Sequence, residues 1–287
     1  MNTTAILNIF QNLRLQDSEL FELTLSREDV EKIGYKSFID LAQIFMMKML
    51  TPNVLDEQTI VLPFQKLCQE SSFHNAMQSS EKYGVESEFF TINKNNQFSF
   101  LYHFQEALKF VKLEEKSQIL NLGINKADEF LVIKNMLTCK EFEAKEFVGI
   151  DYSASIIEYA KKSFTYPNVS FFCHDINLLQ ELDLPKADLI ISIGTLQSSN
   201  LEFNKTFMEL YQNHLKKGGA IILGFPNCRW IDGEMIYGAK VPNYSFSELG
   251  MVIKDIHFCK KYLQQKGYRV VITGKDYLFL SARKIGS

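Results

Sequence analysis

Asparagine, glycine and aspartate residues follow three short apolar runs between residues 118 and 175 of this 287-residue sequence. The first run ends at Asn121 and Gly123, the second ends at Asp151, and the third is followed by Asp175. Glycine adopts a positive φ easily and admits a close neighbour, and a carboxylate accepts hydrogen bonds from hydroxyl and amino groups. The pattern favours a site for a polar ligand. The alternatives are a tight turn at Gly123 and a helix-capping role for Asp175.

Short apolar runs alternate with longer amphipathic stretches after Lys112, which is typical of a parallel α/β sheet with crossover helices. The alternation predicts a doubly wound, seven-stranded, mostly parallel sheet. Only Gly274-Lys275-Asp276 separates the last two runs, so these strands must pair antiparallel. Strands are expected at 118–122, 146–150, 169–172, 188–193, 220–224, 269–273 and 277–282, and helices at 129–137, 155–163, 204–215 and 253–266.

The first 111 residues have a different hydrophobic pattern, because their apolar residues recur mostly at helical spacing, as in the stretches 6–13 and 30–45. They predict a mainly helical extension, with a polar segment at 70–99 and a last helix at 100–112. No Gly, Ser or Pro linker separates this helix from the first strand. We expect the extension, residues 1–111, to close as a lid over the domain formed by 112–287. The alternative is an oligomerisation or partner-binding domain.

A long connection at residues 225–251 follows the fifth strand and is rich in Gly, Pro, Asn and aromatic residues. Such loops are usually functional, and this one leaves the carboxyl end of a strand, where open α/β sheets bind ligands. Arg229, Tyr244 and the following His257 are the candidate catalytic or acceptor-binding residues. Arg229 could bind an anionic group through two hydrogen bonds. The alternative is that Trp230 anchors the loop and Arg229 is a solvated charge.

The motifs at 119–127, 147–153, 171–176 and 187–196 resemble those of the class I S-adenosylmethionine (SAM)-dependent methyltransferase superfamily, over roughly residues 112–284. The resemblance implies an enzyme with SAM as its cofactor. It places the methionyl part of SAM at Gly123, the two ribose hydroxyls at Asp151, and the adenine amino group at Asp175. The implied cofactor-binding residues are Asn121, Gly123, Asn125, Asp151, Tyr152, Asp175, Ile176 and Ser192.

The first turn departs from the family pattern of one acidic residue and three glycines, since this chain has Asn121, Gly123, Asn125 and Ala127. Asparagine tolerates left-handed backbone and alanine is small, so the turn can still form. The missing carboxylate at position 121 removes an expected partner of the cofactor's ammonium group. A SAM-binding or scaffold protein that no longer catalyses is therefore an alternative.

Other functional classes are disfavoured by the same segments. The turn at 123–128 lacks the Gly-x-Gly-x-x-Gly pattern that admits a pyrophosphate, which argues against a dinucleotide-dependent oxidoreductase. No Asn/Asp-Pro-Pro-aromatic signature follows the fourth predicted strand, so methylation of a DNA base amino group is not indicated. The sequence predicts methyl transfer to a small-molecule acceptor, with oxygen, nitrogen and carbon all open. RNA methylation is the alternative, weakened by the absence of a basic arm.

Composition agrees with a globular protein, with 46% hydrophobic and 23% charged residues and a net charge of -3. The five cysteines are widely spaced and include no Cys-x-x-Cys pair, so neither a metal site nor a disulfide framework is expected. The sequence shows no signal peptide and no apolar stretch of the roughly 18 residues that a membrane span needs. We expect a cytoplasmic protein; the sequence leaves its oligomeric state open.

Overall fold

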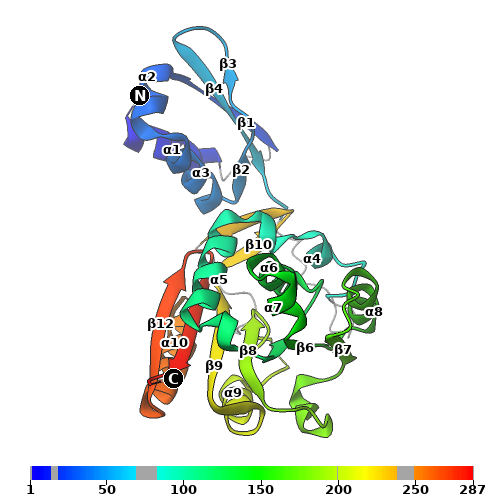
Figure 1. Ribbon diagram of the computed structural model, residues 1–287. Coiled ribbons are helices and arrows are strands. Elements are labelled where there is room, and N and C mark those ends of the chain that lie inside the picture. The colour runs from blue at the N-terminus through cyan, green and yellow to red at the C-terminus, as the bar shows by residue number, and fades with distance from the viewer. Residues whose placement is uncertain (1, 14–18, 69–82, 199, 238–248, 287) are drawn as a thin grey trace. The chain divides into compact units, whose positions relative to one another are not determined.

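The computed structural model describes residues 2–13, 19–68, 83–198, 200–237 and 249–286, which form two compact units (Figure 1). The N-terminal unit comprises Met1–Asn75 together with Trp230–Tyr237. The larger unit comprises Ala76–Arg229 and Gly238–Ser287. Each unit has its own sheet, so each is described by itself.

The larger unit contains a seven-stranded sheet in the order β12-β13-β9-β8-β5-β6-β7. β5 to β9 run parallel, whereas β13 pairs antiparallel with both β9 and β12. The predicted mostly parallel sheet is therefore confirmed, including the antiparallel hairpin at its end. The strands are β5 (Gln118–Leu122), β6 (Glu146–Asp151), β7 (Val169–Cys173), β8 (Ala187–Ile193), β9 (Leu215–Pro226), β12 (Tyr268–Gly274) and β13 (Tyr277–Lys284).

Helices cover both faces of this sheet (Figure 1). Phe104 of α5 (Phe98–Phe110) stacks on Phe279 of β13, with ring centroids 5.9 Å apart. Successive strand residues point to opposite faces, so the neighbouring Leu280 joins the core under α9 (Phe203–Glu209) and α10 (Leu249–Gln265). On the α5 face, Phe130 of α6 (Asp128–Met136) packs against Phe147 of β6. This two-faced burial is what the apolar runs of the strands require.

The remaining elements of the larger unit are short. α8 (Ala154–Ser163) crosses from β6 to β7 and begins at Ser153, whose side chain accepts a hydrogen bond from the Ile156 backbone N–H. The helix predicted at 204–215 is α9 followed by a π-helical turn. The others are α4 (Glu88–Thr91), η3 (Lys94–Asn96), η4 (Leu113–Glu115), α7 (Cys139–Glu143), η5 (Ile176–Glu181) and η6 (Leu210–His214).

The N-terminal unit is built from helices and an antiparallel sheet. The predicted helical stretches are present as α1 (Thr3–Leu13), α2 (Arg27–Ile33) and α3 (Tyr35–Ile44). The sheet was not predicted; in it, β4 (Thr59–Lys66) pairs with β1 (Leu20–Ser26), β2 (Met47–Met49) and β3 (Asn53–Val54). Residues 60–64 are all buried, so β4 lacks the alternation that marks a half-exposed strand. Phe10 of α1 meets Phe64 edge to face at 5.0 Å in the core.

The boundary between the units lies elsewhere than at the predicted residue 111. Helix α5 belongs to the larger unit, where Phe100 and Phe104 are buried against β13. Conversely, part of the long connection groups with the N-terminal unit. There the Gln43 side chain donates to the Met235 carbonyl at 3.0 Å and accepts from the Tyr237 N–H at 3.3 Å. Both partners lie on β11 (Glu234–Tyr237), which pairs with β10 (Cys228–Ile231).

Candidate functional site

The turn after β5 forms although it keeps only one glycine of the family pattern. Gly123 has a φ of +72° and donates its N–H to the Ile150 carbonyl of β6 at 2.8 Å. Asn125 and Ala127 also adopt positive φ, at 46° and 63°, and Ala127 immediately precedes α6. A left-handed conformation costs a non-glycine residue roughly 1–2 kcal/mol. The predicted tolerance of this turn for Asn125 and Ala127 is therefore confirmed.

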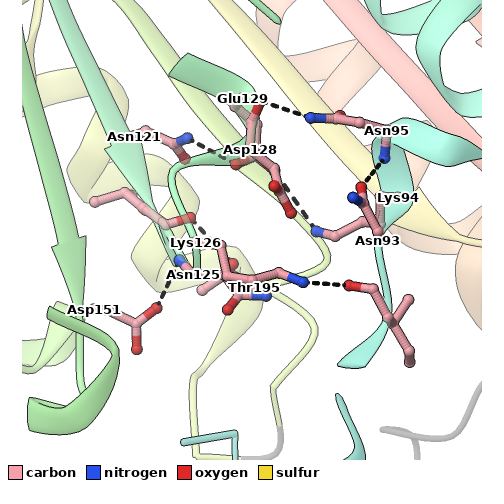
Figure 2. Close-up of polar contacts among 12 residues, drawn as sticks. Asn93, Lys94, Asn95, Asn121, Asn125, Lys126, Asp128, Glu129, Asp151 and Thr195 are labelled. Atoms are coloured by element: carbon pink, nitrogen blue, oxygen red, sulfur yellow. Dashed lines mark hydrogen bonds and ion pairs between the residues drawn. The ribbon is translucent and has the colours of Figure 1, made fainter. Parts of the chain in front are cut away.

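Asp151, at the end of β6, lies beside this turn. One carboxylate oxygen accepts from the Asn125 backbone N–H at 3.2 Å, and the other accepts from the Ser153 N–H at 3.1 Å. These two contacts fix the plane of a half-buried carboxylate at the edge where β5 and β6 end (Figure 2). Two of the predicted site residues, Asn125 and Asp151, are thus in direct contact.

A buried ion pair between Lys94 and Glu129 lies behind the same turn. Neither residue was among the predicted site residues. Asn121 donates from Nδ2 to Glu129 Oε2 at 3.3 Å, and Lys94 Nζ lies 3.6 Å from Glu129 Oε1 (Figure 2). Lys94 and Glu129 are only 4% and 2% exposed. Burial raises the pKa of Glu129, while the Lys94 ammonium acts to lower it. Lys94 also lies 5.9 Å from the ring centres of Phe100 and Tyr277.

One signal in the sequence could have revealed Glu129. Together with Val132, Ile133 and Met136 it follows the i, i+3, i+4, i+7 spacing of a buried helix face. A carboxylate in such a stripe needs a buried partner. Lys94 has no comparable signal, because it lies in the polar segment at 70–99.

The described part of the polar segment, residues 83–97, lies against the turn, and we call it the covering segment. Lys126 holds it by donating from Nζ to the Phe90 carbonyl at 2.7 Å and the Ile92 carbonyl at 2.8 Å. Asn95 Nδ2 donates to the Asp128 carbonyl at 3.1 Å. Burial lowers the pKa of Lys126, yet its two carbonyl acceptors favour the ammonium form. The covering segment is therefore attached to the turn that the sequence singled out.

Thr195, just after β8, occupies the space beside Gly123. A Cβ added to Gly123 would lie 2.0 Å from Thr195 Oγ1, which itself donates to the Leu122 carbonyl at 3.1 Å. The missing side chain at Gly123 thus makes room for Thr195 in this structure.

Comparison with known proteins decides the family. A family model described as a methyltransferase domain matches residues 113–271, which is more than half of the chain. The chain belongs to this family. The resemblance to class I SAM-dependent methyltransferases is confirmed, and the larger unit is hereafter called the methyltransferase unit.

Individual relatives match over shorter regions. Malonyl-[acyl-carrier protein] O-methyltransferase of Priestia megaterium is 38% identical over 87 residues, covering 30% of this chain and 30% of that protein. Carboxy-S-adenosyl-L-methionine synthase of Staphylococcus epidermidis is 26% identical over 152 residues, covering 50% of this chain and 61% of that protein. The chain therefore spans less than two thirds of the length of either relative.

A solved structure supports the fold. The plantazolicin methyltransferase BpumL in complex with SAH superposes with a TM-score of 0.52 at 14% sequence identity. The superposition covers 75% of this chain and 95% of that chain. At this identity the similarity shows the fold alone.

The other predicted cofactor residues are more dispersed. Asp175 accepts from the Asn177 N–H at 2.9 Å and caps η5, so its capping role is present and its contact with adenine stays a prediction. Tyr152 is 53% exposed beyond Asp151, and Ile176 packs on the core under α9 and α10. Ser192 is buried and pairs in register with Leu122, so its side chain and that of Asn121 point to opposite faces of the sheet.

The candidate catalytic residues are not brought together in the part of the chain that the structure describes. Arg229 is half-buried on β10, where burial lowers the pKa of its guanidinium. His257 is exposed on α10, and Tyr244 lies outside the described residues. Cys228 is buried, and burial raises the pKa of its thiol to about 12, so little reactive thiolate is present at neutral pH.

The described ranges contain no group of three or more His, Cys, Asp or Glu side chains that could hold a metal ion. Their helices include none with the length and apolar character needed to cross a membrane. A cavity of about 540 Å³ lies beside β7, lined by residues 161, 164–167 and 169–172. It includes none of the predicted site residues.

Proposed function

We propose that this chain is a SAM-dependent methyltransferase that transfers a methyl group to a small-molecule acceptor. The observation that carries the proposal is the contact of the Asp151 carboxylate with the Asn125 N–H at the carboxyl ends of β5 and β6. Open α/β sheets bind their ligands at this edge. A fixed carboxylate there suits the two neighbouring hydroxyls of an unphosphorylated ribose.

The buried polar atoms of the site also fit SAM. Among the described residues, Oδ1 of Asn121, both side-chain polar atoms of Asn125, and Oγ of Ser192 are buried without a hydrogen-bond partner. Leaving such an atom unpaired costs roughly 1–3 kcal/mol, so a polar ligand or ordered water is expected beside them. SAM offers hydroxyl, amino and ammonium donors for the oxygens, and its carboxylate can accept from the Asn125 amide nitrogen.

Methyl transfer from SAM requires little covalent chemistry from the protein itself. SAM supplies a methyl group on a sulfonium, which a nucleophilic atom of the acceptor can attack directly. The protein's part is to hold the acceptor in line with that methyl group and to exclude water. The covering segment, fixed by Lys126, is suited to exclude water from the turn. In this proposal the accepting atom is oxygen, nitrogen or carbon.

One observation favours a second candidate, a SAM-binding protein that does not catalyse. Thr195 fills the space beside Gly123 that a closely approaching ligand would use. If Thr195 keeps this position, the ligand can approach the turn only at other residues. Binding would then persist in a geometry unsuited to methyl transfer.

A transfer assay separates these functions. Protein and SAM labelled on the methyl group are incubated with a small-molecule extract, and in parallel with total RNA. We expect label in the small-molecule fraction, and clearly less label when Asp151→Ala replaces the wild-type protein at limiting SAM. Label only in RNA would support the RNA methyltransferase alternative. Bound SAM with no transfer to either fraction would support the protein that does not catalyse.

A further inference from the structure

Asn121 is held in one orientation by its neighbours. Its side chain lies at the end of β5, where the residue is 1% exposed, and its Nδ2 donates to Glu129 Oε2. An ionised carboxylate only accepts hydrogen bonds, so Glu129 selects the amide orientation that turns nitrogen toward it. Oδ1 of Asn121 therefore points away from Glu129, and within the described residues it has no hydrogen-bond partner.

The Lys94 ammonium favours the ionised, accepting form of the Glu129 carboxylate, opposing the burial that raises the pKa of this group. An isolated charge in a protein interior is costly, so a buried carboxylate needs a cation beside it. Lys94 Nζ is 3.6 Å from Glu129 Oε1, and both side chains are almost fully buried. The backbone before Lys94 is itself fixed, because the Asn93 side chain accepts from the Asn95 N–H at 3.0 Å. The ion pair therefore joins the covering segment to the first turn of α6.

We propose that Glu129 and Lys94 are positioning residues that hold the Asn121 oxygen as an acceptor for the cationic amino group of the cofactor. This inference rests on the proposed function. An ammonium group is the donor that best satisfies a buried carbonyl oxygen, because hydrogen bonds to charged groups are about twice as strong as neutral ones. This arrangement of Lys94, Glu129 and Asn121 strengthens the binding of ligands that carry the amino group. It leaves the binding of the adenosine part unchanged.

Two ligands test this division. S-adenosylhomocysteine carries the amino group, whereas 5′-methylthioadenosine keeps the adenosine and sulfur but lacks it. Calorimetry gives the dissociation constants of both for the wild type and for Glu129→Gln. A glutamine at this position can pair with either end of the Asn121 amide, so the orientation is no longer fixed. We expect the variant to bind S-adenosylhomocysteine about tenfold or more weakly, with 5′-methylthioadenosine affinity unchanged within about twofold.

A double variant supplies the rescue. Asn121→Asp combined with Glu129→Gln moves the carboxylate eight positions along the chain while conserving net charge and nearly conserving volume. Its carboxylate needs no particular orientation to accept the ammonium group, so S-adenosylhomocysteine affinity should recover to within about threefold of the wild type. Lys94→Met combined with Glu129→Gln removes both charges without restoring the orientation, and should remain weak toward S-adenosylhomocysteine alone.

Equal losses of both ligands in Glu129→Gln, or no loss of either, would overturn the inference, since a purely structural ion pair does not distinguish them. Absence of rescue in the double variant would also count against it. Failure of the wild type to bind either ligand would instead overturn the proposed function. The ratio of the two affinities therefore separates the two failures.

Discussion

Replacing Asp151 with alanine should weaken the binding of S-adenosylhomocysteine by about tenfold or more, as measured by calorimetry. The carboxylate is fixed by the N–H groups of Asn125 and Ser153 at the carboxyl ends of β5 and β6. A hydrogen bond to a charged group contributes roughly 1.5–3 kcal/mol, which corresponds to about tenfold or more in affinity. Asp151→Asn, which keeps the shape but loses the charge, should show a smaller loss in the same direction.

Asp183→Ala is the matched control, because Asp183 is an exposed aspartate between η5 and β8 in the same unit. It should bind like the wild type. Thermal unfolding of each variant checks that the turn after β5 is intact. Wild-type affinity in a folded Asp151→Ala protein would remove Asp151 from the site.

Phe104→Ala should destabilise the methyltransferase unit by about 3–5 kcal/mol in denaturant unfolding, the typical loss when a buried aromatic ring is removed. Phe104 is fully buried, and its ring contacts those of Phe100 and Phe279. This loss of stability is expected because α5 packs against the sheet of this unit and forms part of its core. A hinged lid would open without such a loss.

Phe98→Ala is the control for this change, because Phe98 begins the same helix but is 85% exposed. Its effect should stay within about 0.5 kcal/mol. If the two variants are equally stable, α5 is not part of the packed core, and the lid predicted over residues 1–111 would regain its last helix.

The sheet of the methyltransferase unit could be predicted from the sequence because its strands are buried on both faces. Each buried strand leaves a short apolar run, and amphipathic crossovers separate the runs. The N-terminal sheet was missed because three of its strands are short or fully buried, and only β1 alternates between exposed and buried residues over its second half. The helical periodicity around them dominated the interpretation.

Only those residues of the candidate site that lie directly after predicted strands could be predicted from the sequence. Gly123, Asn125 and Asp151 are fixed by their places after β5 and β6, and parallel pairing brings those strand ends to one edge. Lys94 reaches the same place from the covering segment, across 35 positions of sequence from Glu129. No local pattern encodes such a contact. The sequence also did not predict that part of the long connection groups with the N-terminal unit. The contacts of the Gln43 side chain with β11 join residues nearly 200 positions apart.

Hydrogen exchange with and without S-adenosylhomocysteine shows where along the chain the ligand binds, and so tests whether the turn after β5 is the cofactor site. We expect added protection in residues 121–127 and 150–155, together with the covering segment at 83–97, which Lys126 holds against the turn. The residues that line the cavity beside β7 should not change. No change with ligand at saturating concentration, or protection confined to that cavity or to the N-terminal unit, would rule out a cofactor site at this turn.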